Sequence, residues 1–367
     1  MQPTRHGFIG AYTRDGYVMF DPERMLGGNA ERRIRVRGGY GKARAAAIAA
    51  AVKRILERGY EADVLHSPLE PELIEGVVCP SLSLIITSAD TCDPCDTASV
   101  CIDLDEALRT VGSGARLDAV KALAEETLSY ESRAIRYMEA AAPLRTDAED
   151  EYARIFNQAA LDSMLRPWIE SITSHREDSG NGMESRFFVE AITARGFIQH
   201  LDSVIMPRLW RLSGPWGSDF HTPLSRLRDA ALSKGLHVMC AMEHCQPGRI
   251  AHLLIPELGL FITSEVSVHA LAGAAQRTID LRLAMPAAET FSQHTLHALA
   301  YDELMVEQLM EKASYALDLA RQTRQRIDRT REERADEQVM RMLTEAALAV
   351  LEQAFADEVK QSAYAFD

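Results

Sequence analysis

The chain reads RIRVRGGYGKARA over residues 33–45, where a β-prone run meets a glycine turn and then a helical stretch. Apolar side chains recur at helical spacing from Ile48 to Ile55, and Gly59 ends the helix. Another β-prone run covers residues 62–66. A strand, a glycine turn, a helix and a strand in this order predict a phosphate-binding βαβ unit, whose turn directs backbone N–H groups at an anion.

The same unit is found a second time. A β-prone run over residues 208–212 leads into a glycine turn at 214–217, a helical stretch ends at Gly235, and a strand-prone run covers 237–242. Flanking blocks repeat in the same order, FIGAYTRDGYVMF at residues 8–20 with FVEAITARGFIQH at 188–200, and VVCPSLSLIITS at 77–88 with LLIPELGLFITS at 253–264. The chain is therefore predicted to be a tandem duplication with an approximate internal two-fold axis.

The first glycine turn lacks the residues that a phosphate loop needs. The distance in sequence from the turn to the glycine that ends the helix is the same in both copies, which fixes the register. Read from Gly38, the pattern G-x-x-x-x-G-K-[ST] places Ala43, Arg44 and Ala45 at its last three positions. Arg44 keeps a positive charge as a planar fork, whereas Ala45 cannot bind Mg²⁺. Lys42 lies before the position of the motif lysine.

The second turn has diverged further. Gly214, Gly217 and Ser218 belong to this degenerate loop, and Asp219 and Phe220 follow where the motif has glycine and lysine. A carboxylate repels a polyphosphate and a phenyl ring brings no charge. Phosphate binding is therefore not expected at the second loop.

The acidic partner of a phosphate loop is also missing. The two strands that should carry an Mg²⁺-binding aspartate end in Thr-Ser, at Ser88 and Ser264. Asp90 and Glu265 follow and could replace it only through the intervening loop. We therefore assign no catalytic residue and no metal ligand, and Mg²⁺ is not an expected cofactor.

These motifs resemble an uncharacterised bacterial family of tandem-repeat P-loop ATPase-like proteins. The similar features are the order FxxAxTxxG(F/Y), glycine turn, ERGY at residues 57–60, LH at 65–66 and PxLxLxIT, and they extend over almost the whole chain. The resemblance implies an α/β fold with two tandem P-loop NTPase-like domains, each carrying a long helical hairpin. The chain departs from that family at the lysine and the Ser/Thr of both loops, which argues against ATP hydrolysis.

Length and composition are consistent with two such units. The 367 residues are 47% hydrophobic, so each half can bury a core. A polar, glycine-containing segment at residues 176–184 predicts a boundary between domains 1–178 and 182–367. Residues 104–173 and 299–365 are rich in Ala, Leu, Glu and Arg and are expected to form the hairpins, which pack the halves together or dock a protein partner.

Charge limits the partners. With 40 basic and 54 acidic residues the net charge is −14, which disfavours nucleic acid and anionic membranes. The arginine-rich residues 321–334 contain interleaved carboxylates and are expected to form a solvated helix. No apolar run has the length of a membrane span, and a cytoplasmic protein is predicted.

Cysteines and histidines near the strand ends leave further hypotheses open. Cys92 and Cys95 have the C-x₂-C spacing of a zinc site and Cys101 lies nearby, so the sequence allows either a metal site or a reduced loop. His66 and His244 follow corresponding strands, where we expect each to hydrogen-bond the neighbouring loop.

Two functions follow from these observations. The first is a non-hydrolysing, nucleotide- or phosphate-binding scaffold, a pseudoenzyme with ATP as its candidate ligand. Its site would be the first loop, at Gly38, Gly39, Gly41, Lys42 and Arg44. The alternative is an active ATPase or phosphotransferase in which Arg44 or Lys42 replaces the loop lysine.

Overall fold

Two six-stranded mixed sheets form the centre of the molecule in the computed structural model, which describes residues 4–26, 28, 30–89, 99–108, 114–174, 181–266, 274–285 and 291–364. The first sheet has the order β1-β5-β6-β7-β4-β8 and the second has the order β9-β13-β14-β15-β12-β16. Strands at the same place in the two orders correspond in the sequence repeat. The predicted duplication is therefore confirmed at the level of architecture.

The strands of the first sheet are β1 (Arg5–Phe8), β4 (Arg32–Arg37), β5 (Asp63–His66), β6 (Ile74–Cys79), β7 (Leu84–Ala89) and β8 (Ser99–Asp103). Those of the second sheet are β9 (Met183–Phe187), β12 (Arg208–Gly214), β13 (His237–Met242), β14 (Ile250–Ile255), β15 (Leu260–Val266) and β16 (Arg277–Asp280). A two-stranded hairpin follows the first strand of each half, β2 (Gly10–Thr13) with β3 (Gly16–Met19) and β10 (Glu190–Thr193) with β11 (Gly196–Gln199).

Six α-helices complete the described fold: α1 (Gly41–Glu57), α2 (Gly114–Ile155), α3 (Gln158–Thr173), α4 (His221–Ser233), α5 (Gln293–Glu332) and α6 (Glu337–Tyr364). Single turns of 3₁₀ helix lie at η1 (Pro22–Leu26), η2 (Pro80–Leu82), η3 (Leu104–Ala107), η4 (Leu201–Ser203), η5 (Pro256–Leu258) and η6 (Leu281–Ala284). None of the helices that the structure describes is long and apolar enough to cross a membrane.

The strand–turn–helix–strand unit forms as predicted, but its strands are not neighbours. Helix α1 connects β4 to β5, and the antiparallel pair β6–β7 lies between these strands in the sheet. β4 pairs in parallel with β7 and with β8. The fold is therefore an α/β arrangement with mixed sheets, and its relation to P-loop NTPases remains a proposal.

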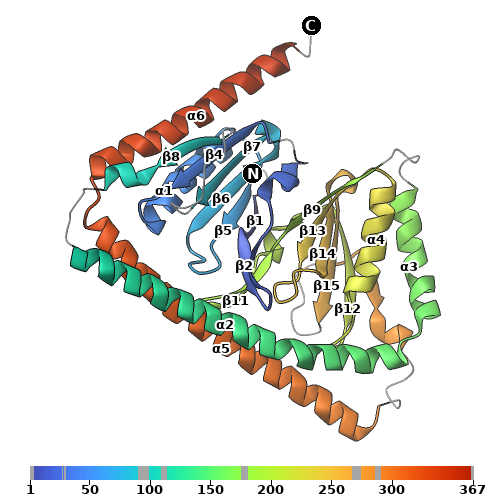
Figure 1. Cartoon of the computed structure of the whole chain (residues 1–367). Coiled ribbons are helices and arrows are strands. Elements are labelled where there is room, and N and C mark those ends of the chain that lie inside the picture. The colour runs from blue at the N-terminus through green and yellow to red at the C-terminus, as the bar shows by residue number, and fades with distance from the viewer. Residues whose placement is uncertain are drawn as a thin grey trace.

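The two longest helices lie side by side as an antiparallel pair beneath both sheets (Figure 1). Thr127 of α2 and Thr323 of α5 share a hydrogen bond of 2.8 Å between their hydroxyl groups. Small and apolar side chains from both helices, among them Ala134, Met138, Ala313 and Leu317, fill a common cluster with residues of the β2–β3 and β10–β11 hairpins. Packing of α2 on α5 therefore joins the two halves of the chain.

The helical segments do not form a hairpin within each half. After α2 has crossed the molecule, α3 packs on α4 and the second sheet, while α6 packs on α1 and the first sheet (Figure 1). Leu161, Leu165 and Trp168 of α3 are buried in the core of the second half. Leu351 and Phe355 of α6 are buried in the core of the first half. The expectation of one helical hairpin in each half is wrong, because the long helices carry α3 and α6 to opposite sheets.

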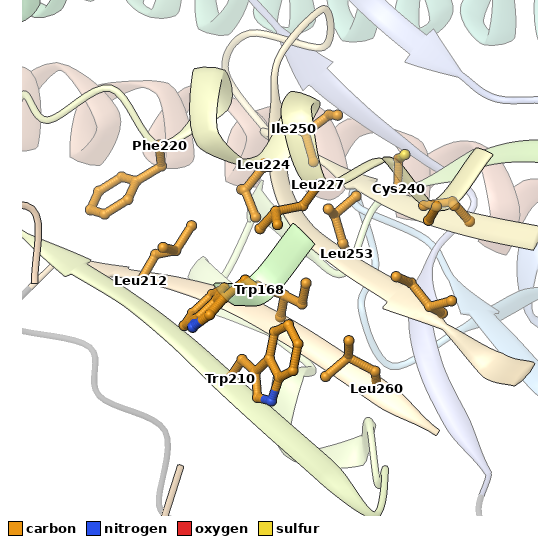
Figure 2. Close-up of a cluster of buried hydrophobic side chains, with 14 of the residues drawn as sticks. Trp168, Trp210, Leu212, Phe220, Leu224, Leu227, Cys240, Ile250, Leu253 and Leu260 are labelled. Atoms are coloured by element: carbon orange, nitrogen blue, oxygen red, sulfur yellow. The ribbon is translucent and has the colours of Figure 1, made fainter. Parts of the chain in front are cut away.

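A paired-tryptophan core anchors α3 to the second sheet (Figure 2). The rings of Trp168 and Trp210 have centroids 4.8 Å apart, and both side chains are almost fully buried. The guanidinium groups of Arg208 and Arg277 lie 5.2 and 4.8 Å from the Trp210 ring. A separate apolar cluster joins the two sheets, with Leu65, Val78, Ile85, Phe187, Met239, Leu254 and Phe261 among its members.

Candidate functional site

The first glycine loop is a tight connection between β4 and α1. Gly38 and Gly39 have positive φ angles of 71° and 59°, which glycine adopts without the strain that a Cβ would bring. A Cβ on Gly38 would lie 2.7 Å from Cγ of Asp105, and a Cβ on Gly39 would lie 2.8 Å from Cβ of Leu104. The loop is therefore packed against η3, the turn that follows β8.

Two loop N–H groups donate to carboxylates of the protein itself. The Gly39 N–H donates to Oδ1 of Asp105 at 2.8 Å, and the Gly41 N–H donates to Oδ2 of Asp328 at 2.9 Å. Asp328 belongs to α5 of the second half and is only 7% exposed. Anions stabilise the N-terminus of a helix, where the first N–H groups have no partner within the helix. Here the two carboxylates accept hydrogen bonds from loop N–H groups, which in a phosphate loop would bind the phosphate.

Arg44 points back into the loop. Its Nη1 donates to the Gly38 carbonyl at 2.7 Å and its Nε donates to Oγ of Ser88 at 2.9 Å, and the residue is only 5% exposed. Arg331 of α5 donates from Nη1 to the Gly39 carbonyl at 2.9 Å. Both guanidinium groups therefore hold the loop in this conformation.

Lys42 lies elsewhere. It is exposed and lines a groove of about 490 Å³ together with Tyr40, Glu332 and Arg341, among others. Burial, followed by the neighbouring carboxylate of Glu332, raises the pKa of Tyr40. The structure thus places Gly38 and Gly39 in the loop and Gly41, Lys42 and Arg44 in the first turn of α1, and the two cations face different surroundings.

The second loop is covered by the first half's long helix. Gly217 has φ of 85°, and a Cβ on it would lie 3.0 Å from Cβ of Ala148 on α2. A Cβ on Gly214 would lie 2.7 Å from Oγ of Ser218, whose N–H donates to the Pro215 carbonyl at 3.1 Å. Each glycine loop is therefore closed by a helix from the other half.

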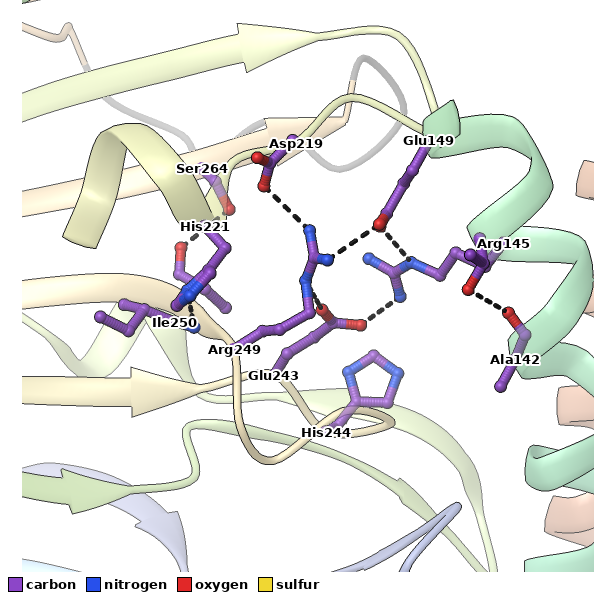
Figure 3. Close-up of polar contacts among 12 residues, drawn as sticks. Ala142, Arg145, Glu149, Asp219, His221, Glu243, His244, Arg249, Ile250 and Ser264 are labelled. Carbon is purple, nitrogen blue, oxygen red and sulfur yellow. Dashed lines mark hydrogen bonds and ion pairs between the residues drawn. The ribbon is translucent and has the colours of Figure 1, made fainter. Parts of the chain in front are cut away.

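An ionic network fills the space beside the second loop (Figure 3). Arg249 contacts Oε2 of Glu149 at 2.8 Å and Oδ1 of Asp219 at 2.9 Å. Arg145 of α2 forms ion pairs with Glu243 and, at 3.7 Å, with Glu149. Burial raises the pKa of Glu149 despite the nearby guanidinium groups of Arg249 and Arg145. Asp219 thus pairs with a cation of the protein, which is a role the sequence did not indicate.

A cavity of about 170 Å³ lies at the carboxyl ends of the parallel strands β12, β13 and β15. Its wall includes Arg145, Glu190, Ser218, His244, Arg249 and His252. Nδ1 of His244 lies 2.9 Å from Oε1 of Glu190, and Nε2 of His252 lies 3.6 Å from Oε2 of the same carboxylate.

Two pKa shifts follow from this pairing. Burial opposes ionisation of Glu190, but the two imidazoles outweigh it and hold the pKa of Glu190 well below its usual range. Burial would likewise lower the pKa of His244, but the Cys245 thiol and the Glu190 carboxylate raise it well above the usual value. The charged groups around this cavity therefore pair with one another.

Several further sequence hypotheses can be placed. The Nδ1 atom of His66 lies 2.9 Å from the Pro71 carbonyl, so the predicted contact of this histidine with the next loop is confirmed, whereas the His244 imidazole pairs with Glu190 of the β10–β11 hairpin. Glu265 pairs with Arg211 at 2.9 Å.

Asp90, Cys92 and Cys95 lie outside the described residues, as do residues 176–180 of the predicted boundary segment 176–184. Cys101 is disulfide-bonded, so the expectation of a reduced thiol is wrong at this position. Among the described side chains, no group of three or more His, Cys, Asp or Glu residues is arranged to hold a metal ion.

Sequence reasoning did not identify Asp105, Asp328 and Arg331 as loop contacts. Asp328 and Arg331 lie in the arginine-rich segment 321–334, which was expected to be solvated, and that expectation is wrong for both because they face the first glycine loop. Comparison with protein-family models, with curated protein sequences and with solved structures finds no match for this chain.

Proposed function

We propose that the protein is a non-hydrolysing scaffold derived from a tandem P-loop-like architecture. In this proposal the first glycine loop acts as a joint between the halves. The observation that carries it is the pair of hydrogen bonds from the loop N–H groups of Gly39 and Gly41 to the carboxylates of Asp105 and Asp328. In this proposal each carboxylate takes the place of a phosphate oxygen, and the carboxylate of Asp328 also ties α5 to the first half.

The charges around the first glycine loop also favour a structural role. A nucleotide polyphosphate would have to displace both carboxylates, because two anions cannot share the same N–H donors without strong repulsion. Arg44 would also have to leave the Gly38 carbonyl and Ser88, and doing so would leave buried polar atoms without partners. These costs favour a structural role for the loop over turnover of ATP.

The alternative is an ATPase or phosphotransferase that uses Arg44 or Lys42. It would require the loop to open, with Arg44 turning away from Gly38 or with Lys42 leaving its exposed groove. Because both alternatives involve the same loop, one set of measurements distinguishes them.

We expect no Mg²⁺-dependent ATP turnover by the purified chain and no calorimetric ATP binding at micromolar concentrations. The physical reason is that the loop donors and Arg44 are already engaged. Phosphate release and isothermal titration, with and without Mg²⁺, provide the measurements. Turnover that is lost in Arg44→Ala or in Lys42→Ala would overturn the scaffold proposal in favour of an enzyme.

The joint itself can be tested with Asp328→Ala. The variant leaves the Gly41 N–H at the start of α1 without its acceptor and removes a buried contact between halves, so we expect the free energy of unfolding to fall by about 1–3 kcal/mol. Denaturant titration measures the change. Asp328→Asn keeps an oxygen acceptor and should lose less stability. Glu333→Ala, which removes an exposed carboxylate at the C-cap of α5, should change stability by less than about 0.5 kcal/mol. An equal loss in the free energy of unfolding for all three variants would contradict the proposal that this contact joins the two halves.

A further inference from the structure

Three histidines from both halves meet away from the two glycine loops. His6 lies in β1, His66 ends β5, and His200 follows β11 in the second half. Their ring centroids are 5.2 Å apart for His6 and His66, 4.9 Å for His66 and His200, and 5.8 Å for His6 and His200. We refer to these three residues as the histidine cluster.

The histidine cluster lies on the contact between the two halves. The Phe8 N–H donates to the Phe188 carbonyl at 2.8 Å, and the His6 N–H donates to Oγ of Ser203 at 2.9 Å. The Phe8 ring also packs on His200, with centroids 5.0 Å apart. A change in the charge or position of these rings is therefore expected to affect the backbone hydrogen bonds that join β1 to the second half.

The hydrogen bond between His6 and His66 requires that at least one of the two imidazoles is neutral. Nδ1 of His66 lies 2.9 Å from the Pro71 carbonyl, which can only accept, so this nitrogen carries the proton. Nε2 of His66 is then the acceptor for Nδ1–H of His6, at 2.9 Å. If both rings were protonated, Nδ1–H of His6 and Nε2–H of His66 would face each other, and this bond would be lost. In addition, Nε2 of His200 is buried with no partner among the described atoms.

The surroundings favour the neutral forms as well. Burial lowers the pKa of His6, of His66 and of His200, and in the last case to about 4. The neighbouring imidazoles lower the pKa of His66 and of His200 further, because a second charge in the cluster would be repelled. The Asp202 carboxylate opposes these effects at His6 and His200 but is outweighed.

We propose that the histidine cluster is an acid-sensitive contact that closes the seam between the two halves when its rings are neutral and loosens it when they take up protons. The inference is independent of the scaffold proposal, since none of its residues lies in a glycine loop. Stability from a histidine with a lowered folded-state pKa is fully present above the ordinary value near 6.5 and is lost as the pH falls toward the folded-state value. The seam should therefore weaken below about pH 6.5, with the transition extending toward pH 4 for His200.

Hydrogen exchange over pH 7.5 to 5.0, corrected for the intrinsic exchange rate, gives the direct test. We expect the local opening constant at the amides of His6 and Phe8 to rise at least about tenfold over this range, because each proton bound only in the open state shifts the equilibrium. Thermal unfolding should show the same effect. In the intact chain the cluster should contribute about 2–4 °C of the fall in Tm between these pH values.

Variants connect the effect to the cluster. His200→Gln and His66→Gln keep polar side chains that do not titrate, so the pH dependence of exchange at His6 and Phe8 should shrink even if either variant is less stable at pH 7.5. His297→Gln, at an exposed position on α5, is the matched control and should keep the full dependence. Unchanged exchange at these amides between pH 7.5 and 5.0 in the intact chain would overturn the proposal, as would an equal pH dependence in His200→Gln and the control.

Discussion

Neither segment 1–178 nor segment 182–367 is expected to fold when it is produced alone. The first segment lacks α6, which buries Leu351 and Phe355 in the core of the first half, and the second lacks α3, which buries Leu161, Leu165, Trp168 and Ile172 in the core of the second. At about 1.5–3 kcal/mol for each buried apolar side chain, the four lost from the second segment remove roughly 6–12 kcal/mol, and the two lost from the first remove roughly 3–6 kcal/mol. This is comparable to the whole stability of a typical protein, about 5–15 kcal/mol.

Circular dichroism and thermal unfolding of the separate segments measure this outcome. Co-production of the two segments is the control, because it restores every helix to its sheet and differs from the intact chain only by the cut. We expect the co-produced segments to associate and to unfold cooperatively. Residues 156–285, which keep α3 with the second sheet, should resist protease better than 182–367. Cooperative unfolding of 1–178 alone would show that the domain division predicted from the sequence describes an independent unit.

Trp210→Ala should be among the most destabilising single substitutions in the second half. The side chain is 1% exposed, packs at a tilt against Trp168 of α3 and lies beside the guanidinium groups of Arg208 and Arg277. Replacing a buried tryptophan by alanine leaves a cavity and costs about 3–5 kcal/mol. Here it would also weaken the attachment of a helix that reaches this core from the other half.

Equilibrium denaturation in urea or guanidinium chloride, followed by circular dichroism, provides the measurement for Trp210→Ala. Tyr315→Ala serves as the aromatic control, because Tyr315 is 67% exposed on α5 and its removal should change the free energy of unfolding by less than about 0.5 kcal/mol. A loss below about 1 kcal/mol for Trp210→Ala would mean that the paired tryptophans do not hold α3 on the sheet.

Local patterns in the sequence predicted several elements of each half, though not the order of their strands in the sheets. The repeated blocks indicated the duplication, and the expected strand at residues 237–242 coincides with β13. The β-prone run at 62–66 lies within one residue of β5. The predicted glycine turn connects β4 to α1, which is the predicted helix. These features depend on short-range preferences of the backbone, which are visible in a window of a few residues.

The partners of the helices and of the loop could not be predicted in the same way. An amphipathic pattern shows that α3 and α6 bury one face, but it does not say against which sheet. In the sequence, Asp328 is one of several carboxylates in an arginine-rich segment. Only the position of α5 beside Gly41 shows that it contacts the first loop. Both features depend on contacts between residues far apart in the chain.

The exchange of terminal helices has a consequence for synthesis of the chain. Arg54 of α1 meets Glu352 of α6 across a separation of 298 residues, and the same packing completes the core of the first half. At a translation rate of about 5–20 residues per second, the first half must wait roughly 15–60 s for α6 to be made. During that interval its apolar face is uncovered on the nascent chain. We therefore expect the first half to depend on a chaperone until α6 has been translated.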